Sequence, residues 1–156
     1  MSIDWSAVSR HAGPEDSPGF MLWRASVEWR RAIDRALAPL KLTQPQFVVL
    51  AGIGWLTRNG DGVRQVDVGR HVGMDPNTMS QVLGGLERRK LVSRRRYERD
   101  SGSYPGLTRA GRALLVRATG LVEAVDERFF GVLGADIPVA IALFAKLFSG
   151  EAAATR

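Results

Sequence analysis

Polar side chains at helical spacing lie between Pro76 and Arg88, and they are the residues of this sequence most suited to chemistry. In a helix each residue advances about 100°, so the apolar residues of this segment form one narrow stripe: Met79, Val82, Leu83 and Leu86. The other sides carry short polar or small side chains and one arginine: Asn77, Thr78, Ser80, Gln81, Gly84, Gly85 and Arg88. No acidic residue occurs from Pro76 to Leu86.

This combination matches the chemistry of base edges in DNA. The major groove admits one α-helix, and there an amide side chain can pair with adenine and a guanidinium with guanine. Polar residues on a helix surface are more often only solvated, but a solvated face normally intersperses Glu and Lys. We therefore expect a reading face made of these residues: Asn77, Thr78, Ser80, Gln81, Gly84 and Arg88.

A dense group of basic residues follows directly. Seven of the twelve residues from Arg88 to Arg99 are basic. Alone, such a run can be a solvated charge cluster, but after a reading face it fits phosphate contacts, with one guanidinium in the adjacent minor groove. The candidates are Arg94, Arg95, Arg96 and Arg99, with Gln65 as a weaker candidate that can also be a plain helix cap. Because neighbouring strand residues face opposite ways, one of these arginines can instead pair with Glu98 or Asp100.

Helix signals on both sides of a short turn position the reading face. A helix over residues 65–72 ends at Gly73, which suits the left-handed position after a helix. Asp75 then caps a second helix, and Pro76 occupies its first turn. Two helices joined by a turn of three or four residues with a glycine form a helix-turn-helix. We predict the second helix over residues 76–90.

A small hairpin is predicted after this helix. Residues 91–97 and 104–107 have the composition of two strands, and residues 98–103 that of a polar turn. Cap signals and apolar spacing predict helices elsewhere, starting at Ser17, Thr43, Thr108 and Asp136. The predicted fold class is therefore mainly α with a small β-hairpin wing, that is, a winged helix-turn-helix lobe with additional helices.

The chain divides into a flexible arm at 1–16, a dimerisation helix at 17–40, a winged helix-turn-helix lobe at 41–110, dimerisation helices at 111–150 and a tail at 151–156. The helix that starts at Thr43 has almost no polar side and is predicted to be buried at the centre. The terminal helices carry more uncharged apolar residues than this helix can cover. Mutual burial with a second copy is the expected solution, so we expect a homodimer.

The chain resembles the MarR family of bacterial transcription regulators over residues 18–148, in three segments: LTQPQFVVL, VDVGRHVGMDPNTMSQVLGGLERRKLVSRR and LTRAGRALL. The resemblance implies a triangular homodimer formed by the two chain ends, whose winged lobes bind a palindromic operator. It also implies release of DNA by a small, often aromatic ligand. The family wing commonly carries Asp-x-Arg, whose arginine enters the minor groove. Here Asp100-Ser101-Gly102 lacks that arginine, so Arg96 or Arg99 replaces it or the wing contacts phosphates alone.

Aromatic side chains are candidates for a ligand pocket between the dimer base and the DNA lobe. They are Trp23, Trp29, Phe47, Trp55 and His71. Aromatic walls with a few polar groups suit a flat aromatic ligand, so a small aromatic effector is the expected ligand. The alternative, which is the commoner role of such residues, is plain core packing.

The composition limits the other functions. A formal net charge of +6 and a pI near 10.7 favour an acidic partner such as double-stranded DNA. The absence of cysteine excludes disulfides, thiolate metal sites and thiol redox switches. The N-terminus lacks the pattern of a secretory signal, and no run of about 18 uncharged apolar residues stands out. We therefore expect a cytoplasmic protein with no membrane partner.

Three other functions compete with sequence-specific DNA binding. An enzyme is one, but the two histidines have no metal-binding spacing, and Gly52-x-Gly54 lies inside a predicted helix rather than in a phosphate-binding loop. We therefore expect no catalytic residue, metal or cofactor. A sequence-indifferent architectural DNA-binding protein would share the positive charge but would not need an acid-free reading face. The third is a winged helix used only for protein contact.

Overall fold

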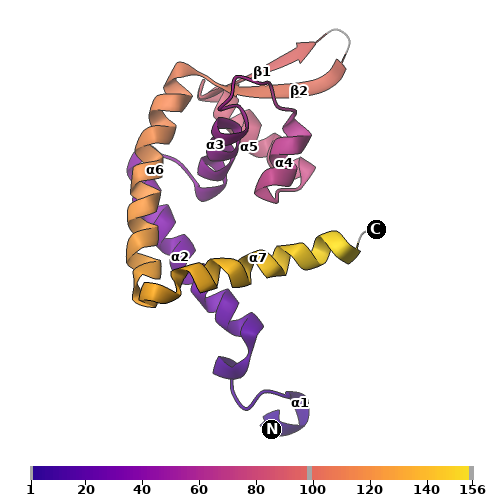
Figure 1. Ribbon diagram of the computed structural model, residues 1–156, viewed down its shortest axis with the longest axis vertical. Helices are drawn as coiled ribbons and strands as arrows, with labels where there is room; N and C mark the ends of the chain where they lie inside the picture. Colours follow the sequence, from indigo (N-terminus) through magenta and orange to yellow (C-terminus); the bar gives the residue numbers. More distant parts are fainter. Residues whose placement is uncertain (1, 98–99, 155–156) are drawn as a thin grey trace.

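The computed structural model describes residues 2–97 and 100–154 and is mostly helical (Figure 1). Its α-helices are α1 Trp5–Val8, α2 Pro18–Leu37, α3 Gln44–Leu56, α4 Gln65–Val72, α5 Pro76–Arg88, α6 Arg109–Phe130 and α7 Ile137–Ala154. Three short 3-10 segments join them: η1 Pro14–Asp16, η2 Ala38–Leu40 and η3 Gly131–Asp136. The two strands are β1 Val92–Tyr97 and β2 Asp100–Leu107. The predicted fold class is thus confirmed.

Side-chain caps start the main helices where the sequence places them. Ser17 accepts a hydrogen bond from the backbone N–H of Phe20 and begins α2. Thr43 begins α3 in a reciprocal capping box with Gln46. Thr108 accepts from the N–H of Gly111 at 3.0 Å and begins α6. Each cap satisfies an N–H group that the helix itself leaves unpaired, so these starts depend only on residues close in sequence.

The helix-turn-helix forms from α4 and α5 as predicted. Gly73 ends α4 with φ +69°, a left-handed conformation that glycine adopts without strain. Asp75 then accepts from the N–H groups of Asn77 and Thr78, both at 3.0 Å, and begins α5. The turn between the helices therefore depends on a left-handed backbone at Gly73 and an extended backbone at Asp75.

The core lies where α3, α4 and α5 meet, with α2 and α6 closing one side. Leu50, Ile53, Val68, Leu83 and Leu86 are fully buried there. The prediction that α3 is buried all round is wrong at Trp55, which is 57% exposed, because helices pack against only part of the circumference of α3.

The hairpin is longer than predicted. β2 begins at Asp100 rather than at residue 104, so the segment 100–103 is strand and not turn. β1 and β2 are antiparallel, with Arg95 opposite Tyr104 and an irregularity in the pairing between Arg96 and Tyr97. The small polar residues at 100–103 have the composition of a turn, but their backbone pairs with β1 and is therefore strand. The prediction of a turn failed because strand formation depends on this pairing more than on composition.

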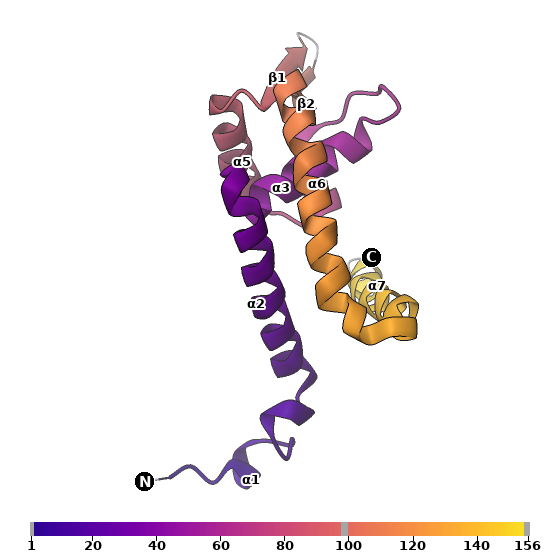
Figure 2. The ribbon, with the colours of Figure 1, turned by 90° about the vertical axis from the view of Figure 1, so that its left-hand side faces the viewer.

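Helices α2 and α6 run side by side, and α6 descends from the wing along the lobe before both helices extend below it (Figure 2). The indole N–H of Trp29 on α2 donates to Asp126 on α6 at 2.7 Å. The segment 1–16, expected as an arm without regular structure, contains the short α1 and η1. α1 carries exposed apolar side chains such as Trp5, which is 67% exposed.

Helix α7 projects sideways from the lower end of α6 and leaves its apolar side chains in solvent (Figure 1). Its exposed large apolar residues are Val139, Ile141, Leu143, Phe144, Leu147 and Phe148. An 18-residue window within Arg109–Phe148 has a mean hydropathy of 1.8 and is long and apolar enough to cross a membrane, with 0% of it buried in this chain. Asp136 and Lys146 interrupt this apolar region, so the expectation that no run of about 18 uncharged apolar residues occurs is confirmed, although the window passes a test of length and hydropathy alone.

Candidate nucleic-acid interface

Helix α5 presents the predicted reading face to solvent. Its apolar stripe is inside: Met79 is 1% exposed and Leu83 and Leu86 are 0% exposed. The side chains of the reading face are exposed: Asn77, Thr78, Ser80, Gln81 and Arg88. The helix is therefore held by one side and free to meet a large partner with the other, as a helix in a major groove must be.

The two adjacent glycines of α5 have different surroundings. A side chain at Gly85 would contact the amide of Gln46 on α3 at 3.6 Å, so this glycine lies at a helix–helix contact. A side chain at Gly84 would meet only the end of Arg88, at 3.5 Å. Because Gly84 has no side chain on the outer surface of α5, a partner can approach the helix backbone closely there.

Two contacts fix the start of the reading face. Hydrogen bonds from Thr78 and Asn77 hold the pKa of the Asp75 carboxyl below its usual range, so the cap stays ionised at neutral pH. The side-chain amide of Gln65 on α4 donates to the hydroxyl of Ser80 at 3.1 Å. Gln65, predicted as a phosphate contact or a cap, thus links α4 to the reading face, with its amide already hydrogen-bonded.

The wing arginines divide into an ion-paired residue and exposed ones. Arg94 lies half-buried and donates from Nε, at 3.0 Å, and from Nη2 to the Glu87 carboxylate at the end of α5. This pairing lowers the pKa of Glu87. One wing arginine was predicted to pair with Glu98 or Asp100; Arg94 pairs instead with Glu87, because β1 runs back past the last turn of α5, and Glu98 lies outside the described residues. Arg95 and Arg96 are exposed, and Arg99 lies outside the described residues.

The structure adds residues that the sequence did not single out. Arg64, directly before α4, donates from Nε to the hydroxyl of Tyr104 on β2 at 3.2 Å. Tyr104 lies opposite Arg95 across the hairpin, so Arg64 and Arg95 flank the same tyrosine. The only sequence signal for this group was the position of Arg64 at the start of the helix-turn-helix.

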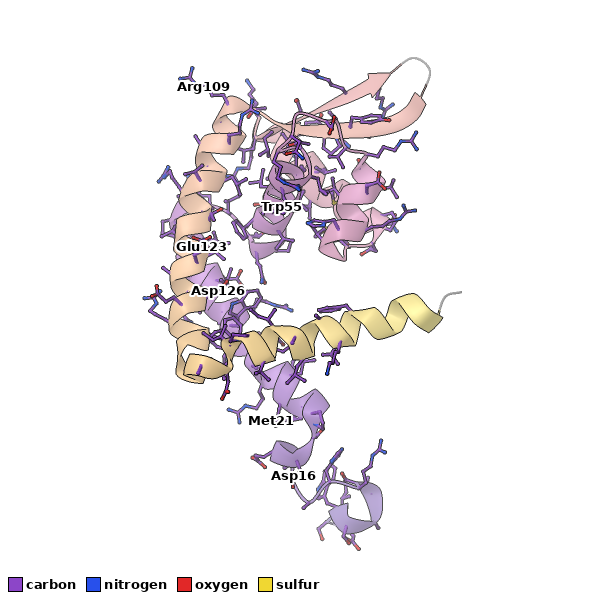
Figure 3. The ribbon with its side chains drawn as sticks, in the orientation of Figure 1. Asp16, Met21, Trp55, Arg109, Glu123 and Asp126 are labelled. Carbon is purple, nitrogen blue, oxygen red and sulfur yellow. The ribbon has the colours of Figure 1, made fainter. Side chains whose placement is uncertain are left out.

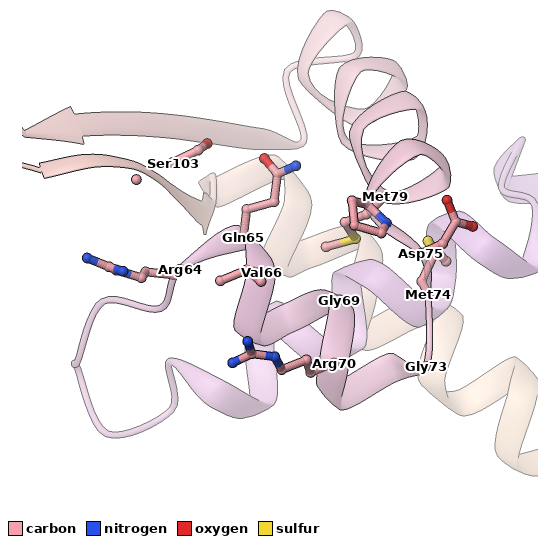
Figure 4. Close-up of a pocket in the computed structure, with 12 residues that line it drawn as sticks. Arg64, Gln65, Val66, Gly69, Arg70, Gly73, Met74, Asp75, Met79 and Ser103 are labelled. Carbon is pink, nitrogen blue, oxygen red and sulfur yellow. The ribbon is translucent and has the colours of Figure 1, made fainter. Parts of the chain in front are cut away.

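A groove of about 770 Å³ separates the reading helix from the wing (Figure 4). Arg64 and Arg70 lie along one side of it, and Met79 and Asp75 lie across from them. Arg70 pairs with Asp67 at 3.3 Å, so the acidic residue on α4 is neutralised locally. The rim of the groove therefore carries arginines, while its floor is apolar.

The predicted ligand-pocket residues do not all meet. Phe47, Trp55 and His71 line an open depression of about 320 Å³ between α3 and α4. Arg58 lies over the Trp55 ring, 4.0 Å from its centre. Trp23 is 64% exposed on α2 and does not line this depression; Figure 3 shows Met21, two residues before it, far from Trp55.

Trp29 also lies elsewhere, between α2 and α6. Including both tryptophans in one pocket is wrong within a single chain, because α2 leads away from the lobe. Among residues 2–97 and 100–154, no group of three or more His, Asp or Glu side chains could hold a metal ion.

Curated proteins similar to this chain include helix-turn-helix regulators. It is 32% identical over 129 residues to an uncharacterized HTH-type transcriptional regulator of Bacillus subtilis, YdcH, covering 82% of this chain and 86% of YdcH. It is 35% identical over 123 residues to the HTH-type transcriptional repressor Rv2887 of Mycobacterium tuberculosis, covering 78% of this chain and 86% of the repressor. No protein-family model matches the chain.

Solved structures of such regulators share this fold. CouR from Rhodococcus jostii, bound to p-coumaroyl-CoA, has a TM-score of 0.76 at 28% identity and covers 89% of this chain and 94% of CouR. The MarR family protein Rv2887 in complex with salicylic acid has a TM-score of 0.61 at 30% identity, covering 85% of this chain and 96% of Rv2887. Sequence and fold therefore agree over nearly the whole length of these regulators.

Proposed function

The chain belongs to the MarR family of DNA-binding transcriptional regulators, and we propose that it is a ligand-responsive repressor that binds a palindromic operator as a homodimer. The observation that carries this proposal is the exposed, acid-free side of α5 next to the exposed arginines of β1. Its relatives are regulators rather than enzymes, and we assign no catalytic residue to it. The proposed location is the cytoplasm, because the relatives are proteins of bacteria, whose DNA lies there.

In this proposal α5 supplies the sequence preference and the wing supplies affinity. Asn77, Gln81 and Arg88 pair with base edges in the major groove. Arg95 and Arg96 contact phosphates beside it, where contacts position the protein without reading sequence. Arg64 is a further phosphate-contact candidate, because its hydrogen bond to Tyr104 fixes the direction of its guanidinium between the two elements.

The homodimer covers the apolar surface of the terminal helices. Between α6 and α7 lies an open depression of about 420 Å³, lined by residues such as Phe130 and Phe144. The exposed apolar side chains of α7 continue from this depression, and a second copy is the favoured partner for this surface. Large exposed apolar patches mark interaction sites, and a two-fold axis pairs the same patch with itself. Covered in this way, the apolar surface of α7 does not need a membrane.

A small aromatic ligand is the proposed effector. The depression between α3 and α4 combines the rings of Phe47 and Trp55 with His71 and the cation of Arg58 nearby. Solved relatives are bound to salicylic acid and to p-coumaroyl-CoA, and this supports an aromatic, acidic ligand class for this chain. Because the depression adjoins α4, a ligand there can alter the position of the helix-turn-helix.

Selection of duplexes from a randomised pool by the purified protein tests the DNA-binding proposal. We expect enrichment of a palindrome whose half-sites lie about one helical turn apart, with affinity that falls steeply as salt rises. Enrichment of no sequence, with strong binding to all duplexes, would instead establish an architectural DNA-binding protein. Addition of salicylate as a probe should weaken binding to the enriched duplex and quench Trp55 fluorescence; Trp55→Phe is the control for the optical signal.

A further inference from the structure

Arg89, the residue after α5, points away from the reading face and holds the end of another helix. Its Nη1 donates to the carbonyl oxygen of Lys41 at 2.7 Å, and its Nη2 donates to that of Leu40 at 3.3 Å. The side-chain oxygen of Gln46 is a third acceptor, 3.4 Å from Nη1. One guanidinium therefore joins the end of the reading helix to the junction between α2 and α3.

The carbonyls that Arg89 binds belong to Leu40 and Lys41, at the end of η2, the short segment that directly follows α2. Helix ends leave carbonyl groups without partners within the helix and carry partial negative charge, which a cation stabilises. Lys41 itself has φ +52° and turns the chain sharply out of η2. Arg89 thus caps the end of η2, from a segment 48 residues later in the chain than Lys41.

A second contact on the same side of α5 reinforces this connection. Gly85 lies one turn before Arg89, and the amide of Gln46 packs against it. The Gln46 side chain also accepts from the N–H of Thr43 at 3.2 Å and so belongs to the cap of α3. Gly85 and Arg89 together hold the end of α5 against the junction.

We infer that Arg89 is a positioning residue that fixes the angle between the reading helix and α2, and thereby sets the half-site spacing that the dimer accepts. This inference rests on the proposed function, in which α2 belongs to the dimer base and each α5 reads one half-site. A rigid connection between the two helices fixes the distance between the two reading helices. Arg88, its neighbour, is exposed on the reading face and has no such contact with α2 among the described residues.

Duplexes with altered spacing separate this role from direct DNA contact. The palindrome selected by the wild-type protein is rebuilt with one or two base pairs added to or removed from its centre, and a duplex with a single half-site is included. Binding is measured for wild type, Arg89→Lys and the matched control Arg88→Lys. Arg89→Lys keeps the positive charge but loses the two-pronged hydrogen bonding of a guanidinium.

We expect Arg89→Lys to reduce the preference for the selected spacing by about fivefold or more, with single half-site affinity and salt dependence unchanged. Arg88→Lys should keep the spacing preference and lose base preference. An unchanged spacing preference in Arg89→Lys would overturn the inference, as would an equal loss on every duplex, which indicates direct DNA contact or a loosened fold. If Arg89→Lys does not fold, Arg89→Met, which keeps the aliphatic stem, serves the same test. A wild-type protein that selects no duplex would refute the proposed function itself, and the inference with it.

Discussion

Arg88 and Arg95 are both exposed arginines, but in the proposed function the elements that carry them give them different roles. Arg88 ends α5 on the side that faces away from the buried stripe, whereas Arg95 lies on the hairpin opposite Tyr104. A guanidinium on the reading helix reaches base edges, and one on the wing reaches phosphates. Identical side chains should therefore differ in how their loss affects sequence preference.

Replacing Arg88 with alanine should lower the preference for the selected operator by about 1–3 kcal/mol and change nonspecific binding little. Replacing Arg95 should weaken binding to all duplexes alike and reduce the salt slope by about one. Both are measured by titrating labelled duplexes at several salt concentrations. An equal loss of specific and nonspecific binding in Arg88→Ala would remove its assigned role.

Lys90 has φ +57°, a left-handed conformation that is strained for a residue with a side chain. The strain amounts to about 1–2 kcal/mol, and the greater freedom of glycine in the unfolded chain offsets about half of it. Lys90→Gly should therefore raise the free energy of unfolding by about 0.5–1 kcal/mol, with a small rise in Tm. Lys41→Gly, at φ +52°, should act in the same direction. A fall in Tm for both variants would show that these side chains make stabilising contacts.

At the scale of elements, the ion pair between Glu87 and Arg94 joins the reading helix to the wing. It connects the last turn of α5 to β1 across the reversal at Lys90 and Leu91, where the chain leaves the helix. The angle between the two DNA-binding elements therefore depends on a partly exposed pair, whose contribution to stability is at most about 1 kcal/mol.

The stability that this pair adds should depend on pH. The Arg94 guanidinium holds the pKa of Glu87 below its ordinary value, so the pair stabilises the fold above the unfolded pKa of about 4.3. That contribution is lost as the pH falls through the lower, folded pKa. Wild type should be more stable than Glu87→Gln near neutral pH, and the difference should vanish in acid. Denaturant unfolding at several pH values measures it, and a difference that persists in acid would contradict the sign. Arg94→Gln should remove the same pH-dependent difference.

At the scale of the whole molecule, the lobe shares one buried core with α2 and α6, whereas the large apolar side chains of α7 stay exposed. The lobe has a closed core around Leu50 and Leu83, whereas α7 leaves Ile141 and Phe148 more than half exposed, at 62% and 72%. A helix with this much apolar surface is stable in water only when something covers it. In the proposed function, the chain ends account for assembly and the middle of the chain for DNA recognition.

Purified protein should sediment as a dimer, and Phe144→Glu combined with Leu147→Glu should convert it to a monomer, because two charges on α7 would be buried without partners. The monomer should keep its affinity for a single half-site and lose the added affinity for the full palindrome. Val66→Glu, an exposed apolar position on α4, is the control and should remain dimeric. A wild-type monomer at all concentrations would exclude the dimeric model.

Local signals explain most of what could be predicted from the sequence. The caps at Ser17, Thr43, Asp75 and Thr108 act on N–H groups within three residues, and the stripe through Met79 and Leu86 follows from helical periodicity. The helix-turn-helix, its exposed polar side and the wing arginines could therefore be predicted from residues that are close together in the chain. The family resemblance followed from the same segments.

Tertiary packing decided what the arginines and tryptophans do. In the sequence, Arg89 and Arg94 belong to the same basic run as Arg95, but the fold turns Arg89 toward Lys41 and Arg94 toward Glu87. Likewise Trp55 and Trp23 look equivalent as aromatic residues on apolar helices, yet only Trp55 lines the depression beside α4. Composition records which groups are present, whereas hydrogen bonds between distant segments depend on how helices cross, and that geometry exists only in the folded chain.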